Sequence, residues 1–151
     1  MRVRLSHMLS CLQRLFSKDP VGRPSVLAIT PFYMDQLALR IASSRKDWDL
    51  LICPTFRSGL RTLRKFPVSV ILFDLETKDI EWRRGIHLLL SQPSAPCLIV
   101  LTRSLDDNLW QSAFERGVYD LQPKPLKDNT ALIESVRAAH DLVSSHELTH
   151  P

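Results

Sequence analysis

The stretch Val70-Ile71-Leu72-Phe73-Asp74 decides how this chain folds, because four apolar residues run without a break into a single acid. Continuous apolar runs are typical of strands that are buried on both faces, as in a parallel sheet. We extend this strand back to Val68. Comparable runs cover Val26–Ile29, Leu50–Cys53, Cys97–Leu101 and, more weakly, Tyr119–Gln122. The chain therefore contains five predicted strands.

Helix-length stretches with apolar residues at helical spacing separate and follow these strands. They cover Phe32–Lys46, Arg57–Phe66, Ile80–Leu90, Ser104–Arg116 and a last helix that starts near Asp128–Thr130 and runs to Val143. In the first of them we expect Leu37 and Ile41 to face the core. Five strands alternating with five helices predict a doubly wound α/β fold with a parallel sheet.

Functional side chains are expected where the strands end, because ligands of such sheets bind at the carboxyl ends of the strands. Strand one ends at Thr30-Pro31, strand three at Asp74, strand four at Thr102-Arg103, and strand five runs into Lys124. A carboxylate there can accept a phosphoryl group, a hydroxyl can contact its oxygens, and a lysine can balance its charge.

Residues 25–143 resemble the receiver domain of bacterial response regulators. The resemblance depends on Val-Ile-Leu-Phe-Asp74-Leu, on Cys97-Leu-Ile-Val-Leu-Thr102, and on Gly117-Val-Tyr-Asp-Leu-Gln-Pro-Lys124-Pro125. It implies a flavodoxin-like (βα)5 fold with strand order 2-1-3-4-5. It also implies that Asp74 is equivalent to the phosphoacceptor, and that Thr102 and Lys124 are equivalent to the phosphate-contacting residues.

The chain departs from the family where active receivers carry two acids that help to hold Mg²⁺. Thr30 and Pro31 occupy these positions, and Mg²⁺ requires hard oxygen ligands in octahedral geometry. We expect the next acid, Asp35, to point elsewhere, whereas Glu76 could compensate in part. Mg²⁺ binding is therefore predicted to be weak or absent, with slow or no phosphorylation of Asp74.

Further departures surround the site. Arg103 replaces a small residue of the family, and its guanidinium could reach Asp74 or remain an exposed loop arginine. Leu121 stands where the family has an aromatic switch residue. Pro123 lacks a backbone donor, which favours an edge strand.

The net positive charge of the chain lies at its amino end. The 151 residues carry a net charge of +4, and residues 1–24, with five basic residues and one acid, account for it. Residues 25–151 are neutral, so we predict no nucleic-acid binding by the domain. Residues 1–19 have apolar residues at helical spacing, namely Leu5, Met8, Leu9, Leu12, Leu15 and Phe16. This segment could pack on the domain or a partner, lie on a membrane surface, or be an extension with little role.

Residues 20–24 are predicted as a linker and residues 144–151 as a polar tail without an output domain. No apolar run approaches the roughly 20 residues that cross a bilayer, and three widely spaced cysteines favour a reducing cytoplasm. Neither a glycine-rich phosphate loop nor a Ser-His-Asp arrangement is present, so we expect no enzyme and no cofactor.

The leading hypothesis is a stand-alone degenerate receiver that acts as an interaction or adaptor module in bacterial signalling. Its partner would be a histidine kinase or another signalling protein, and a homodimer is a further option. Trp110 and Tyr119 could mark a contact surface if Trp110 is exposed. The alternatives are a working response regulator phosphorylated on Asp74 by a kinase, or a flavodoxin-like cofactor-binding or enzyme domain.

Overall fold

A computed structural model describes residues 22–46, 48–104, 106–126 and 129–149. The predicted amphipathic segment of residues 1–19 lies outside the described residues, so the structure does not test it. In the part of the chain that is described, no helix is long and apolar enough to span a bilayer.

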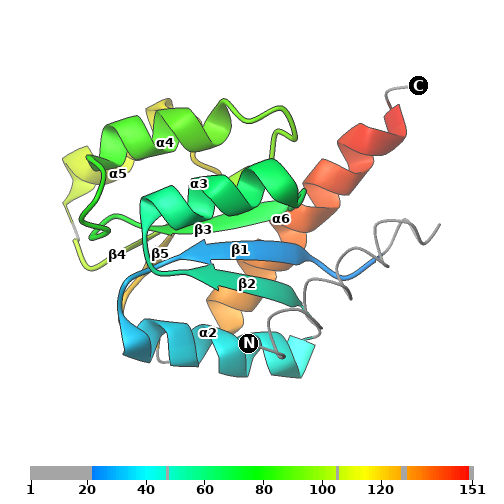
Figure 1. Ribbon diagram of the computed structural model, residues 1–151, viewed down its shortest axis with the longest axis horizontal. Helices are drawn as coiled ribbons and strands as arrows, with labels where there is room; N and C mark the ends of the chain where they lie inside the picture. Colours follow the sequence, from blue (N-terminus) through cyan, green and yellow to red (C-terminus); the bar gives the residue numbers. More distant parts are fainter. Residues whose placement is uncertain (1–21, 47, 105, 127–128, 150–151) are drawn as a thin grey trace.

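Five parallel strands form one sheet in the order β2-β1-β3-β4-β5, which confirms the predicted flavodoxin-like topology (Figure 1). Their bounds are Ser25–Ile29 for β1, Asp49–Cys53 for β2, Val70–Asp74 for β3, Cys97–Thr102 for β4 and Asp120–Pro123 for β5. β3 lies in the middle of the sheet, and its residues are all buried. This explains why its sequence is apolar without alternation.

The register brings the carboxyl ends of the strands to one edge of the sheet. Ile29 pairs with both Cys53 and Phe73, and Thr102 pairs with Pro123. Asp74 is therefore one residue beyond the level of Ile29, beside the loop that follows β1. Pro123 lies on an outer strand, as its missing donor predicted.

Helices cover both faces of the sheet (Figure 1). Their bounds are Tyr33–Lys46 for α2, Phe56–Lys65 for α3, Trp82–Leu90 for α4, Asp107–Glu115 for α5 and Thr130–Thr149 for α6. One core cluster joins the sheet to α3, α4 and α5, and the other joins it to α2 and α6. The inner strands β1, β3 and β4 thus contribute to both clusters, as the two-sided burial expected from the sequence requires, whereas β5 contributes only Leu121, to the first cluster.

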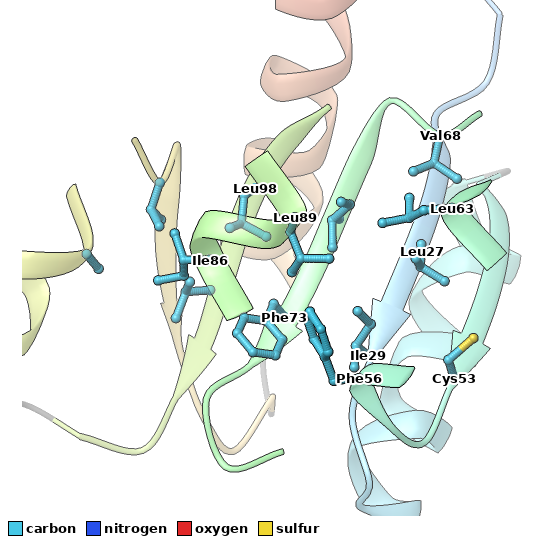
Figure 2. Packing of buried hydrophobic residues seen from close by; sticks show 14 of the residues in the cluster. Leu27, Ile29, Cys53, Phe56, Leu63, Val68, Phe73, Ile86, Leu89 and Leu98 are labelled. Carbon is cyan, nitrogen blue, oxygen red and sulfur yellow. The ribbon is translucent and has the colours of Figure 1, made fainter. Parts of the chain in front are cut away.

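The larger cluster is centred on Phe73, whose ring meets Phe56 edge-to-face at 6.0 Å (Figure 2). Two helical glycines allow this close packing. A Cβ on Gly59 would lie 2.5 Å from Cδ1 of Ile29, and a Cβ on Gly85 would lie 2.8 Å from Cζ of Phe73. The glycines therefore set how closely α3 and α4 approach the sheet.

The orientation of α2 differs from the sequence-based expectation. Its buried face consists of Asp35, Leu39 and Ala42, whereas Leu37 and Ile41 are 38% and 43% exposed. The expectation was wrong because apolar residues lie on both sides of this helix, and a polar residue, Asp35, is on the buried side. Apolar spacing alone does not distinguish the two faces.

Two helix ends also differ from the expected positions. The fourth predicted helix begins at Asp107, because Asp106 caps it by accepting a hydrogen bond from the Asn108 amide. The last helix continues to Thr149, so most of the segment expected as a polar tail is helical. Gly117 ends the α5 turn with a φ of 101°, as a glycine after a helix commonly does.

Candidate functional site at the carboxyl edge of the sheet

The predicted residues Asp74, Glu76 and Lys124 meet at the carboxyl edge of the sheet. The ammonium nitrogen of Lys124 lies 2.7 Å from Oδ2 of Asp74 and 3.0 Å from Oε2 of Glu76. A third carboxylate, that of Asp35, lies 3.1 Å from the same nitrogen. The Lys124 side chain has no exposed surface, so it is an internal cation held by three carboxylates.

Asp74 is fully buried, and both of its carboxylate oxygens accept hydrogen bonds. Oδ2 accepts from the Thr30 hydroxyl at 2.9 Å in addition to the Lys124 ammonium. Oδ1 accepts from the backbone amide of Glu76 at 2.9 Å. Three donors from three different segments therefore satisfy the hydrogen-bonding capacity of this buried carboxylate.

Thr30 thus has a role that the sequence did not predict. We had treated it as a position where an acid is missing. Its hydroxyl instead donates to Asp74, and the residue is completely buried. A hydroxyl at this position donates a hydrogen bond to the Asp74 carboxylate, whereas an acid would add a second negative charge and repel it.

Asp35 was expected to point away from the site, and this expectation was wrong. The residue is 5% exposed and its carboxylate contacts Lys124. Burial of a carboxylate is unfavourable unless a cation and hydrogen bonds compensate for the lost water, and Lys124 supplies both. A detectable signal existed in the sequence, because Asp35, Leu39 and Ala42 follow an i, i+4, i+7 spacing that places them on one face.

Arg103 contacts the cluster from outside, through Glu76. The hypothesis that its guanidinium reaches Asp74 is wrong. Its Nε lies 3.4 Å from Oε2 of Glu76, and more than half of its side chain is exposed. Its guanidinium also lies 5.9 Å from the ring centre of Phe32. Phe32 contacts the Lys124 ammonium at 4.4 Å, a cation–π distance that the sequence did not suggest.

The remaining predicted residues surround this cluster. The Thr102 hydroxyl accepts a hydrogen bond from the Ser104 amide at 3.0 Å, and the Thr102 carbonyl accepts from the Lys124 amide at 2.9 Å. Thr102 therefore helps to fix the backbone that carries Lys124. Leu121 is buried in the core, and Pro31 is partly exposed at the entry to α2.

The charge network shifts the pKa of two groups. Burial by itself would lower the pKa of Lys124, but its hydrogen bonds to Asp74, Glu76 and Asp35 outweigh this effect and raise it. Burial by itself would raise the pKa of Glu76, but Lys124 and Arg103 lower it overall. Both pKa shifts favour the charged forms of Lys124 and Glu76.

The fold family implies a Mg²⁺ site at this edge, and the residues present do not fit one. Strand one is followed by a neutral hydroxyl and a proline, so the negatively charged carboxylate oxygens that attract Mg²⁺ are missing at these positions. The three nearby carboxylates all face one ammonium. Among the described residues, no group of three or more Asp, Glu, His or Cys side chains is arranged to hold a metal ion.

Comparison with known proteins gives a result for structure only. No protein-family model and no curated protein matches the sequence. A CheY-like response regulator receiver domain from Methanospirillum hungatei superposes with a TM-score of 0.74 at 14% identity, over 83% of this chain and 99% of that one.

Two other receiver structures superpose to a similar extent. The receiver domain of an HD domain-containing protein from Pseudomonas fluorescens gives a TM-score of 0.74 at 21% identity, over 82% of this chain and 99% of that chain. The signal receiver domain of a putative LuxO repressor protein from Vibrio parahaemolyticus gives a TM-score of 0.72 at 19% identity. The superposition covers 86% of this chain and 99% of that chain. The structural neighbours are consistently receiver domains, and the fold of this chain is therefore the receiver fold.

Proposed function

We propose that this chain is a degenerate receiver that works as a protein-interaction module in signal transduction, without Mg²⁺-dependent phosphorylation of Asp74. One observation carries the proposal: the Lys124 ammonium is surrounded by Asp74, Glu76 and Asp35, and Asp74 is fully buried. The cation that balances the acidic cluster is thus a side chain of the protein.

This arrangement opposes phosphoryl transfer in two ways. A phosphodonor must touch an oxygen of Asp74, and that carboxylate has no exposed surface and is bonded to three donors. Transfer also needs positive charge on the phosphoryl oxygens, which a metal usually supplies. Here the positive charge of Lys124 is already shared among three carboxylates.

Exposed aromatic side chains support the second half of the proposal, interaction with a partner protein. The described residues include a pair of exposed aromatic side chains near β5, Phe114 at 45% and Tyr119 at 37% exposure. Exposed aromatic residues are enriched where proteins bind one another. Trp110, which we had considered for this surface, instead packs against the core and donates from its indole nitrogen to the Ser104 carbonyl.

The decisive experiment exposes the full chain to acetyl phosphate and, separately, to beryllofluoride, each with Mg²⁺. Intact mass reports a covalent phosphoryl group, and amide NMR spectra report a bound mimic. We expect no change in either. An adduct that disappears in Asp74→Asn, but persists in the exposed control Asp106→Asn, would overturn the proposal and establish a working response regulator.

A gain-of-function variant tests the same idea in the opposite direction. Thr30→Asp with Pro31→Asp restores two carboxylates, and we expect it to become more heat-stable when Mg²⁺ is added. The parent chain is expected to show no such dependence. A parent chain that Mg²⁺ stabilises as strongly as the variant would contradict the proposal, because ligand binding to the native state raises its stability.

A further inference from the structure

Helix α2 presents four large, exposed apolar side chains to solvent. Tyr33 and Met34 are 73% and 70% exposed, and Leu37 and Ile41 are 38% and 43% exposed. We call these four residues the α2 stripe. Their positions follow an i, i+1, i+4, i+8 spacing, which places them along one side of the helix.

The same spacing occurs a second time in the chain. Met8, Leu9, Leu12 and Phe16 also follow i, i+1, i+4, i+8, with every member 25 positions before a member of the α2 stripe. Leu9-x-x-Leu12-x-x-x-Phe16 and Met34-x-x-Leu37-x-x-x-Ile41 share the alternating three- and four-residue spacing of paired helices. Two such rows of equal length can meet side by side without a gap.

The described part of the chain fixes where residues 1–21 must leave the domain. The Pro24 carbonyl accepts a hydrogen bond from the amide of Asp49, the first residue of β2. The Gly22 carbonyl lies 2.8 Å from Nε2 of His140, whose other ring nitrogen lies 2.9 Å from Oγ of Ser69. Asp49 follows the end of α2 by three residues, so the exit point lies at the end of α2.

The direction and the length of the segment agree with this exit point. α2 returns from the carboxyl edge of the sheet to the amino edge, and the segment must approach β1 at that same amino edge. A helix over residues 1–19 would be about 28 Å long, and the 14 residues of α2 span about 21 Å. Pro20, Gly22 and Pro24 provide the reversal into β1.

We infer that residues 1–19 form an amphipathic helix that packs parallel to α2 on the α2 stripe, with Leu9, Leu12 and Phe16 beside Met34, Leu37 and Ile41. Burial of apolar side chains drives this contact. Arg40 and Arg45 of α2 are exposed, and the segment itself has four basic residues before its first acid. Added salt therefore strengthens this contact by screening like charges, whereas it weakens attachment to an anionic membrane.

A disulfide test checks the register in the full chain with its three native cysteines replaced by alanine. Leu9→Cys with Met34→Cys forms the in-register pair, and Leu9→Cys with Ile41→Cys forms the mismatched control of similar exposure. Under mild oxidation we expect the first pair to cross-link within one chain roughly tenfold faster than the second. Equal rates, or cross-links mainly between chains, would overturn the inference.

Hydrogen exchange tests the inference without engineered cysteines. In the unaltered chain, amides of residues 5–16 should exchange roughly tenfold more slowly than in a peptide of residues 1–19. Leu37→Ser with Ile41→Ser should abolish this protection, whereas the control Phe114→Ser, at a similarly exposed apolar residue on α5, should keep it. Peptide-like exchange in the unaltered chain would contradict the inference.

Two other occupants of the α2 stripe give different results. If a second copy covers the stripe, light scattering reports a dimer that Leu37→Ser with Ile41→Ser converts to a monomer. If a membrane covers it, the chain sediments with phosphatidylserine-containing vesicles at low salt and dissociates at high salt. Either result would overturn the inference, which requires a monomer whose protection increases with salt.

Discussion

The Asp35 carboxylate lies 3.1 Å from the Lys124 ammonium, although 89 residues separate them in the sequence. This contact connects the first turn of α2 to the loop after β5, across the width of the sheet between β1 and β5. Since Lys124 also contacts Asp74 at the end of β3, one side chain holds three elements together. The ion cluster is therefore a structural element as well as a candidate site.

Removal of the internal cation should destabilise the domain strongly. Lys124→Met leaves three carboxylates without their shared partner, and loss of one member of a buried ion pair costs about 3–5 kcal/mol. We expect a lower denaturation midpoint in urea, with the exposed Lys78→Met as control. Combination with Asp74→Asn should recover part of the loss, because one negative charge is removed. A loss below that of the control would contradict the central role of Lys124.

The Thr30 hydroxyl should contribute measurably to stability. Thr30→Val keeps the shape of the side chain but removes the donor to the Asp74 carboxylate. Hydrogen bonds to charged groups contribute about 1.5–3 kcal/mol, so the free energy of unfolding should fall by that amount. Thr30→Ser retains the hydroxyl and should lose less. Equal losses in the two variants would show that packing, and not the hydrogen bond, matters at this position.

The lowered pKa of Glu76 predicts a dependence of stability on acidic pH. A carboxylate whose folded-state pKa is lowered stabilises the protein above its ordinary pKa of 4.5, and this contribution disappears as the pH falls through the folded-state value. In Glu76→Gln, the free energy of unfolding should therefore depend less on pH below about pH 5 than it does in the unaltered chain. Because the side chain is partly exposed, we expect a contribution of no more than about 1 kcal/mol. Urea denaturation at several acidic pH values measures it.

The close approach of α3 to β1 should make Gly59 sensitive to substitution. Gly59→Ala places a Cβ 2.5 Å from Cδ1 of Ile29, and overpacking of this kind costs about 1–3 kcal/mol. Ile29→Ala removes Cδ1 and also Cγ1, which would lie 2.6 Å from the new Cβ. The double variant should therefore lose less stability in urea denaturation than the sum of the two single variants. Strict additivity would exclude this contact as the cause.

The sequence predicted the sheet well because burial on both faces leaves a strong pattern. Each of the five strands has an uninterrupted apolar run or a turn signal beside it, and β3 at the centre has the clearest run. The strand ends then located Asp74, Thr102 and Lys124 at one edge. No comparable pattern determined which side of α2 faces the sheet, since both sides carry apolar residues.

The contacts within the site were less predictable, because they depend on where long or short polar side chains point. Asp35 lies a full turn inside a helix, and only the helix orientation brings it to Lys124. Thr30 was assessed by the acid it replaces, so its ability to donate to Asp74 was overlooked. His140 is 9% exposed and bonded through both ring nitrogens, contacts that helical spacing alone does not indicate.

The two bonds of His140 have a mechanical consequence. One ring nitrogen contacts the Gly22 carbonyl, where the amino-terminal segment enters the domain, and the other contacts Ser69, directly before β3. A force applied to the chain before Gly22 is therefore transmitted to Ser69, directly before the strand that ends in Asp74, both through His140 and through the hydrogen bonds between Ser25 and Ser69. The entry point of the amino-terminal segment and the central strand are thus mechanically coupled, and the His140 ring provides one of the links.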